Sequence, residues 1–206
     1  VIVGGLWNNV LNSRYSGIVG GIQNIHDYSV LGHIGGGSGN TIVKGAYLTQ
    51  AENSTLVGGR DNIISGSTNS FLGGGNTNLI SPLTKETNGS NVLVGGKQNR
   101  IVGNAGYSDL VGGLQNKITS LSSSFIGGGD YNQILTSTRS TIVGGTSNRI
   151  YSTQSYNNIV GGTGNQIGHS TVSNDQAGSS IVGGSGNKIY WRPNEETFKT
   201  YNFIGG

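Results

Sequence analysis

The chain has 206 residues, of which 39 are Gly and only 10% are charged. Average domains contain about 7% Gly and about 25% charged residues, so this is not an ordinary globular composition, and the lack of a three-residue Gly period excludes collagen. Cysteine is absent, the net charge is only +3 and no long apolar run occurs, so we expect no disulfide, no nucleic-acid partner and no membrane insertion in this segment.

A block resembling IVGG recurs along the whole chain. Counted from the first apolar residue of each block, the marker, the spacing is 16 or 17 residues in most blocks and 21 or 22 in four. The fixed period indicates a single repeat array over residues 1–206, which we expect to be an excerpt of a longer chain. The markers are Ile2, Ile18, Ile34, Leu56, Leu72, Leu93, Leu110, Ile126, Ile142, Ile159 and Ile181, with a truncated block at Phe203.

Each block predicts one coil with two short strands. Ser or Asn usually stands two residues before the marker and shares its strand face, since strand faces alternate with period two. The following Gly-Gly pair permits a tight turn, and an Asn and a second apolar residue then begin the return strand. Stacked coils place equivalent Asn amides about 4.7 Å apart, so we predict an Asn ladder. Its members are Asn8, Asn24, Asn40, Asn62, Asn78, Asn99, Asn116, Asn132, Asn148, Asn165 and Asn187.

The other face of the first strand shows a volume exchange. The residue after the marker is Val in eight blocks and Gly in three, and in those three the residue before the marker is His33, Phe71 or Phe125. Compensation of this kind is expected where a face is packed, and a 16-residue coil has little apolar material left to cover it. We therefore expect other copies of the chain to cover this face, and three chains around an axis is our choice. The predicted inter-chain residues are Val57, Phe71, Val111, Phe125 and Val143.

The fold expected from these patterns is all-β: a parallel β-solenoid, or β-roll, of about eleven coils of 16–22 residues, assembled as a homotrimer. The S-x-h-x-G…N-x-I repeats resemble the head repeats of trimeric autotransporter adhesins, which form trimeric β-rolls. They are also similar to IGGGxxNxI arrays of phage tail fibres and other virus-associated surface proteins. The resemblance implies a surface-displayed fibre that holds or presents a binding surface.

Four blocks carry insertions between the return strand and the next marker. They cover Val43–Asn53, Ser81–Ser90, Gly168–Gly178 and Tyr190–Tyr201. Insertions in solenoids form loops on one side, which is often the binding side. The last one contains Tyr190, Trp191 and Arg192, residue types favoured at recognition surfaces, so we predict a possible receptor contact there. The alternative is that these rings only pack the loop onto the rod.

Catalytic and metal chemistry find little support. GGTGN and GGSGN at residues 161–165 and 183–187 lack the Asp and the nine-residue period of calcium-binding repeats. His26, His33 and His169 belong to different blocks, and the adjacent Glu195 and Glu196 do not form the opposed carboxylates that a glycosidase requires. We therefore predict no catalytic residue, no metal site and no cofactor.

The expected function is that of a structural shaft or adhesive segment of a trimeric fibre on a virion or cell surface, outside the cell. The expected partners are further copies of the chain and, through the insertions, a surface glycan or a host receptor. One alternative is a polysaccharide-degrading tailspike, which requires a carboxylate cluster in a groove. Another is an ice-binding solenoid, which requires a regular flat Thr array, whereas Thr is scattered here.

Overall fold

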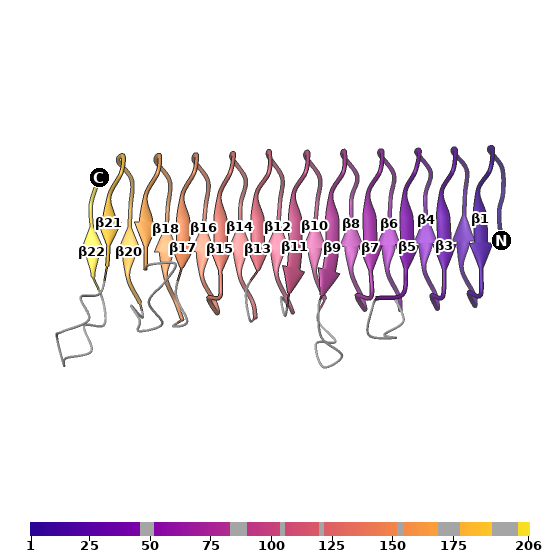
Figure 1. Ribbon diagram of the computed structural model, residues 1–206, viewed down its shortest axis with the longest axis horizontal. Coiled ribbons are helices and arrows are strands. Elements are labelled where there is room, and N and C mark those ends of the chain that lie inside the picture. Colours follow the sequence, from indigo (N-terminus) through magenta and orange to yellow (C-terminus); the bar gives the residue numbers. More distant parts are fainter. Residues whose placement is uncertain are drawn as a thin grey trace.

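The computed structural model describes residues 1–45, 52–82, 90–103, 106–119, 122–151, 155–168, 178–190 and 202–206. Every regular element in this part of the chain is a short β-strand. The chain winds as a parallel β-solenoid in which each coil supplies one strand to each of two sheets, so the strands stand side by side along a rod (Figure 1). The predicted all-β parallel solenoid is confirmed.

The odd-numbered strands form one sheet of eleven parallel strands in chain order, the odd-strand sheet. These are the return strands of the repeat. They are β1 (Asn9–Leu11), β3 (Ile25–Asp27), β5 (Thr41–Val43), β7 (Ile63–Ser65), β9 (Leu79–Pro82), β11 (Arg100–Gly103), β13 (Lys117–Thr119), β15 (Gln133–Leu135), β17 (Arg149–Tyr151), β19 (Gln166–Ile167) and β21 (Lys188–Ile189).

The even-numbered strands form the second sheet, the even-strand sheet, which also has eleven parallel strands and contains the markers. They are β2 (Gly17–Ile18), β4 (His33–Ile34), β6 (Thr55–Leu56), β8 (Phe71–Leu72), β10 (Val92–Leu93), β12 (Asp109–Leu110), β14 (Phe125–Ile126), β16 (Thr141–Ile142), β18 (Asn158–Ile159), β20 (Ser180–Ile181) and β22 (Phe203–Ile204).

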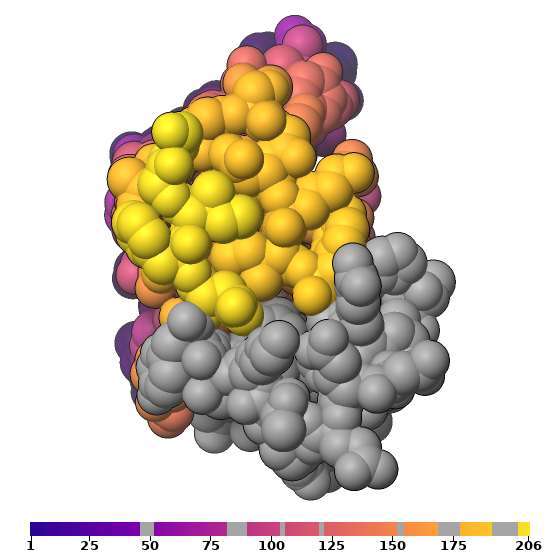
Figure 2. Space-filling view, turned by 90° about the vertical axis from the view of Figure 1, so that its left-hand side faces the viewer, coloured from indigo at the N-terminus to yellow at the C-terminus, as the bar shows by residue number. Residues whose placement is uncertain are grey.

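Equivalent residues of successive coils pair in register, whatever the length of the connection. Ile126 pairs with Ile142 after 16 residues and Ile159 with Ile181 after 22. The backbone bonds therefore run from coil to coil, as where the Val143 N–H donates to the Ile159 carbonyl at 3.0 Å. Viewed along the stack, the C-terminal coil covers most of the coils behind it, so successive coils are offset only slightly (Figure 2).

The last strand corrects the position of the truncated block. The register pairs Ser180 with Phe203 and Ile181 with Ile204, so Ile204 is the marker and Phe203 precedes it. Phe203 therefore takes the place of Phe71 and Phe125, and a Cβ on the following Gly205 would lie 3.3 Å from its ring. This coil repeats the ring-and-glycine combination of the three coils noted above.

One apolar core lies between the two sheets. The markers from Ile18 to Ile181 and the return-strand residues from Ile42 to Ile189 point into it and are at most 6% exposed, whereas Val10 and Ile204 at the ends are only partly buried. Removing such side chains from water stabilises the fold by about 2 kcal/mol each. The core is formed by Ile18, Ile34, Ile42, Leu56, Ile64, Leu72, Ile80, Leu93, Ile101, Leu110, Ile118, Ile126, Ile134, Ile142, Ile150, Ile159, Ile167, Ile181 and Ile189.

The Asn row closes one edge of this core. The backbone N–H of Asn148 donates to Oδ1 of Asn132 at 3.0 Å, and Oδ1 of Asn148 accepts from the N–H of Asn165 at 3.0 Å. Nδ2 of Asn148 donates to the Gly144 carbonyl of its own coil at 2.9 Å and to the Gly162 carbonyl of the next at 3.0 Å. Each buried amide thus satisfies its own turn and ties three coils together, which offsets the cost of burying it.

This arrangement requires the last glycine of each Gly-Gly pair. Gly145 has φ +88°, and a Cβ there would lie 2.2 Å from the Gly162 carbonyl oxygen and 2.7 Å from Nδ2 of Asn148. Both the left-handed backbone and the close approach of the next coil exclude a side chain. The same geometry recurs from Gly5 to Gly162.

Candidate functional site

The outer face of the even-strand sheet carries a row of exposed valines. Each follows a marker, which is buried in every one of these coils except the first, and therefore points away from the core, as strand alternation requires. The predicted inter-chain residues Val57, Val111 and Val143 are 48%, 43% and 50% exposed, and Phe71 is 37% exposed, in the single chain. An exposed apolar row of this kind is a candidate interaction surface, although three coils interrupt it with Gly in place of Val. Its exposed members are Val3, Val19, Val57, Val94, Val111, Val143, Val160 and Val182.

A row of glycines runs beside the valines, one residue further along each coil. In six coils these glycines have no positive φ, and a Cβ added to them would meet no atom within 4 Å. Replacing such a glycine with Ala normally stabilises a protein, because it restricts the unfolded chain. Neither backbone geometry nor packing within the chain therefore explains why Gly recurs here. The six are Gly4, Gly20, Gly112, Gly144, Gly161 and Gly183.

The three coils that have Gly in place of Val differ from the others in backbone as well as in side chains. A Cβ on Gly127 would lie 3.2 Å from the Phe125 ring but only 2.4 Å from the Val143 carbonyl oxygen, and Gly73 is similar. The glycine after each of them has a positive φ, +147° at Gly128. Contact with a ring is thus only part of the reason for these glycines. The backbone of the next coil lies closer than the ring does to the place that a Cβ would occupy.

At Gly35 the backbone of the next coil comes closer than the His33 side chain does. The three nearest atoms to a Cβ on Gly35 all belong to the Val57 backbone, and the closest is the carbonyl oxygen at 2.4 Å. Nδ1 of His33 lies 3.7 Å from the place that a Cβ on Gly17, in the preceding coil, would occupy. At this coil the volume exchange stays a prediction, and the backbone of the next coil makes the closest approach to Gly35.

His26 is fully buried in the core, at a position that other coils fill with Ile. Its Nδ1 lies 3.2 Å from Oγ of Ser13, and its Nε2 has no hydrogen-bond partner. Burial lowers the pKa of His26 from 6.5 to about 4. The imidazole is therefore neutral at physiological pH and acts as a core side chain.

All four insertions interrupt the same kind of connection, from an odd-numbered strand to the next even-numbered one. Trp191 and Arg192 of the predicted receptor contact lie outside the described residues, as do most residues of the insertions. Tyr190 is described: it is 40% exposed, and Nζ of Lys188 lies 5.9 Å from its ring centre. The receptor contact stays a prediction.

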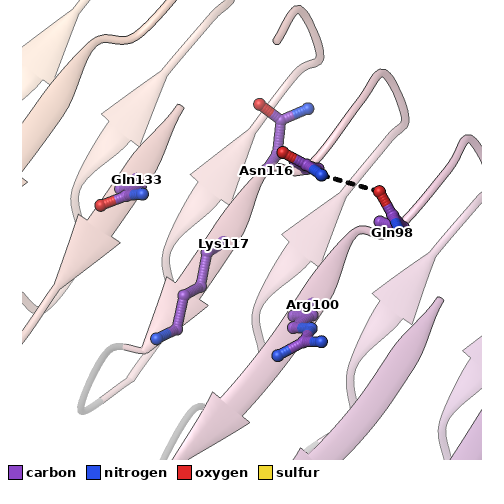
Figure 3. A pocket seen from close by; sticks show the side chains of 6 residues that line it. Gln98, Arg100, Asn116, Lys117 and Gln133 are labelled. Carbon is purple, nitrogen blue, oxygen red and sulfur yellow. Dashed lines mark hydrogen bonds between the residues drawn. The ribbon is translucent and has the colours of Figure 1, made fainter. Parts of the chain in front are cut away.

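The outer face of the odd-strand sheet carries a feature that our sequence analysis missed. The residue between the ladder Asn and the core Ile is basic or Gln in six successive coils, and we call this row the basic stripe. Around its first two members the surface is hollowed, and the depression is lined by side chains of three neighbouring coils (Figure 3). Aligning the repeats on their Asn would have revealed the row. It comprises Arg100, Lys117, Gln133, Arg149, Gln166 and Lys188.

Among the described residues, no three His, Asp or Glu side chains gather as a metal site would require. No helix found in the described part of the chain has the length and hydropathy needed to cross a membrane. No family model matches the sequence, and no curated protein matches it.

Proposed function

We propose that this chain is a non-catalytic, structural and adhesive segment of a homotrimeric fibre displayed outside the cell, on a virion or a cell surface. Three solenoids would pack through their even-strand faces, and the resulting rod would supply rigid reach and carry attachment surfaces. The resemblance of the repeats to trimeric adhesin heads and to phage or viral fibre arrays is in keeping with this role.

The valine row and the glycine row beside it carry the proposal. Val143 is half exposed although its neighbours along the coil pack tightly, and Gly144 next to it retains no side chain although its own chain leaves room for one. A second copy approaching this edge explains both, because apolar side chains gain from burial and glycine permits close contact between backbones. Repetition of the pair along the array gives the contact the length of the rod.

Closed symmetry is the reason for choosing three copies rather than an open assembly. A face that is repeated along the whole rod would otherwise recruit chains without limit, whereas rotation about an axis parallel to the rod closes the contact. A trimer also lets each coil meet equivalent coils of its two partners.

The test is the mass of the protein in solution, measured by sedimentation equilibrium. We expect three times the chain mass for the wild type and dissociation for Val143→Asp, which would bury an unpaired charge in the assembly. Val102→Asp is the matched control, because Val102 lies on β11 of the odd-strand sheet, and it should remain assembled. A monomeric wild type, or dissociation of both variants, would overturn the proposal.

A further inference from the structure

The basic stripe changes the character of the odd-strand face part of the way along the rod. The equivalent position carries Ile25, Thr41, Ile63 and Leu79 in earlier coils, and β11 then begins with Arg100. From β11 to β21 every residue at this position is a cation or Gln. The two halves of one sheet therefore present different chemistry on the same face.

The cations of the stripe are available to an external anion. Among the described residues the single ion pair joins Arg60 and Asp61, and it lies outside the stripe. From residue 90 onwards, the described acidic residues are Asp109 and Asp130. Asp109 lies on the even-strand sheet, and Asp130 lies outside both sheets, where it bridges to Leu114 and Thr146 of the neighbouring coils. Arg100 and Arg149 are exposed and Lys117 is half-buried. The stripe therefore has an unneutralised positive charge within the described structure.

Amide groups accompany these charges. Nε2 of Gln115 donates to Oε1 of Gln98 at 2.7 Å, which fixes a pair of amides beside Arg100 and Lys117 (Figure 3). Gln133 lies on the next strand and completes the lining of the depression. Cations flanked by oriented amides offer both charge pairing and hydrogen bonds to carboxylate and hydroxyl groups.

The spacing of the cations is regular. Strands of one sheet are about 4.8 Å apart, so Lys117, Arg149 and Lys188, which stand on alternate odd-numbered strands, are separated by about 10 Å each. Arg100 adds a fourth charge one coil before Lys117. The whole row is straight and runs parallel to the rod axis over about 24 Å.

We propose that the basic stripe is a binding site for a linear, acidic polysaccharide that lies along the rod. An extended glycan advances by about one coil spacing per sugar, so a chain with an acid on alternate sugars places its charges in step with Lys117, Arg149 and Lys188. The Gln residues between them face the intervening hydroxyl groups. Tyr151 and Tyr190 stand on the same face, two residues after Arg149 and Lys188, and supply surfaces for sugar rings.

Nucleic acid fits the stripe less well. A nucleic-acid strand carries one phosphate per about 3.4 Å of helix axis, so cations at two-coil spacing leave most of the phosphates unpaired. A net charge of +3 also supplies little long-range attraction to a dense polyanion. The site goes beyond the proposed shaft function and does not require a trimer, because the stripe and the valine row lie on opposite sheets.

The experiment is a calorimetric titration of the intact chain with hyaluronan oligosaccharides, a linear chain with a uronic acid on alternate sugars, at low salt. Neutral dextran and oligothymidylate of similar length are titrated in parallel. The test variant is Arg100→Gln/Lys117→Gln/Arg149→Gln. The matched control is Arg14→Gln/Lys44→Gln/Arg139→Gln, which removes the same charge from positions outside the stripe.

We expect the hyaluronan oligosaccharide to bind the wild type and the control variant with dissociation constants within about twofold of each other. The stripe variant should bind at least tenfold more weakly, and dextran should not bind. If both variants lose affinity for the acidic glycan equally, net charge alone explains the binding. If oligothymidylate binds more tightly than the acidic glycan, the stripe is a nucleic-acid site. Either result overturns the proposal. Absence of glycan binding to the wild type also overturns it. Trimer formation is tested separately by sedimentation, so failure of one proposal can be told from failure of the other.

Discussion

His26 and Ile42 are paired in register on neighbouring parallel strands, so the imidazole occupies in its coil the core position that isoleucine fills in the next. Gly32 makes this possible, because a Cβ there would lie 2.2 Å from Nε2 of His26. Most other coils have Ser or Asn at the position of Gly32. The two exceptions to the repeat are therefore one structural adjustment.

The buried histidine makes its coil sensitive to acid. Since the pKa is about 4 when folded and 6.5 when unfolded, the unfolded state binds the proton first as pH falls. The stability of this coil is therefore complete above pH 6.5 and falls between pH 6.5 and 4, by about 3 kcal/mol in total. Hydrogen exchange of the β3 amides at pH 7 and pH 5 measures the loss, and His26→Ile should abolish it. Equal acid sensitivity in that variant would contradict the assignment.

The Asn ladder predicts a large cost for one amide. Asn148→Ala leaves the Gly144 carbonyl and the Asn165 N–H without the partner that the amide supplies, whereas the Gly162 carbonyl still accepts from the Thr146 N–H. Since each buried unsatisfied group costs about 1–3 kcal/mol, we expect at least about 2 kcal/mol of destabilisation. Denaturant unfolding followed by hydrogen exchange at β15 to β19 checks this. Gln166→Ala, at a partly exposed position of the next coil, is the control and should change stability by less than about 0.5 kcal/mol.

Two neighbouring glycines should respond differently to the same change. Gly145→Ala forces a side chain into a left-handed backbone against the next coil, and we expect the coil to unfold locally. Gly144→Ala meets no atom of its own chain, so thermal stability of the isolated chain should stay equal or rise slightly. Under the proposed assembly, Gly144→Ala should nevertheless weaken trimerisation in a concentration series. Unchanged association would remove the explanation offered for this glycine row.

The ring-and-glycine coils can be converted to the common type. Gly127→Val should destabilise, because its Cβ would meet the Val143 carbonyl oxygen and the Phe125 ring. Phe125→Thr/Gly127→Val recreates the Thr-Ile-Val sequence of residues 141–143, whose backbone accommodates Val. We expect the double variant to recover more than about 1 kcal/mol relative to the sum of the single changes. Strict additivity in this double-mutant cycle would show that the ring does not hold the altered backbone.

Asp109 interrupts the apolar face and links its stability to pH. Partial burial beside Val92 and Phe125 raises the pKa of its carboxyl, so ionisation of Asp109 is less favourable in the folded chain than in the unfolded one. The stability that the protonated Asp109 carboxyl contributes to the fold is therefore present at low pH, and it is lost as pH rises through the pKa of the folded state. If the valine row is an interface, Asp109→Asn should strengthen association at pH 7 and leave it unchanged in acid. Sedimentation at both pH values tests this.

The repeat made the architecture predictable because each of its positions has one local role. Ser, marker, glycine, Asn and Ile recur with a fixed spacing, and the two parallel sheets follow from that alternation alone. The register at Phe203 could have been predicted, because Asn202-Phe203-Ile204-Gly205 aligns with Ser124-Phe125-Ile126-Gly127. The place of the His33 ring could not, since it depends on contacts between coils. The basic stripe was missed because Arg100 and Lys117 are outward residues, and nothing inside the rod determines their identity.

The coil-to-coil direction of the backbone hydrogen bonds gives the rod a particular response to being pulled by its ends. Each coil is held by the next, so tension peels coils away singly from an end instead of breaking the whole rod at once. A released coil of 16 residues extends by about 50 Å beyond its place in the stack, and a coil with an insertion extends further. Under load the molecule lengthens in steps, and each step dissipates work that a brittle tether would pass on to its attachment point.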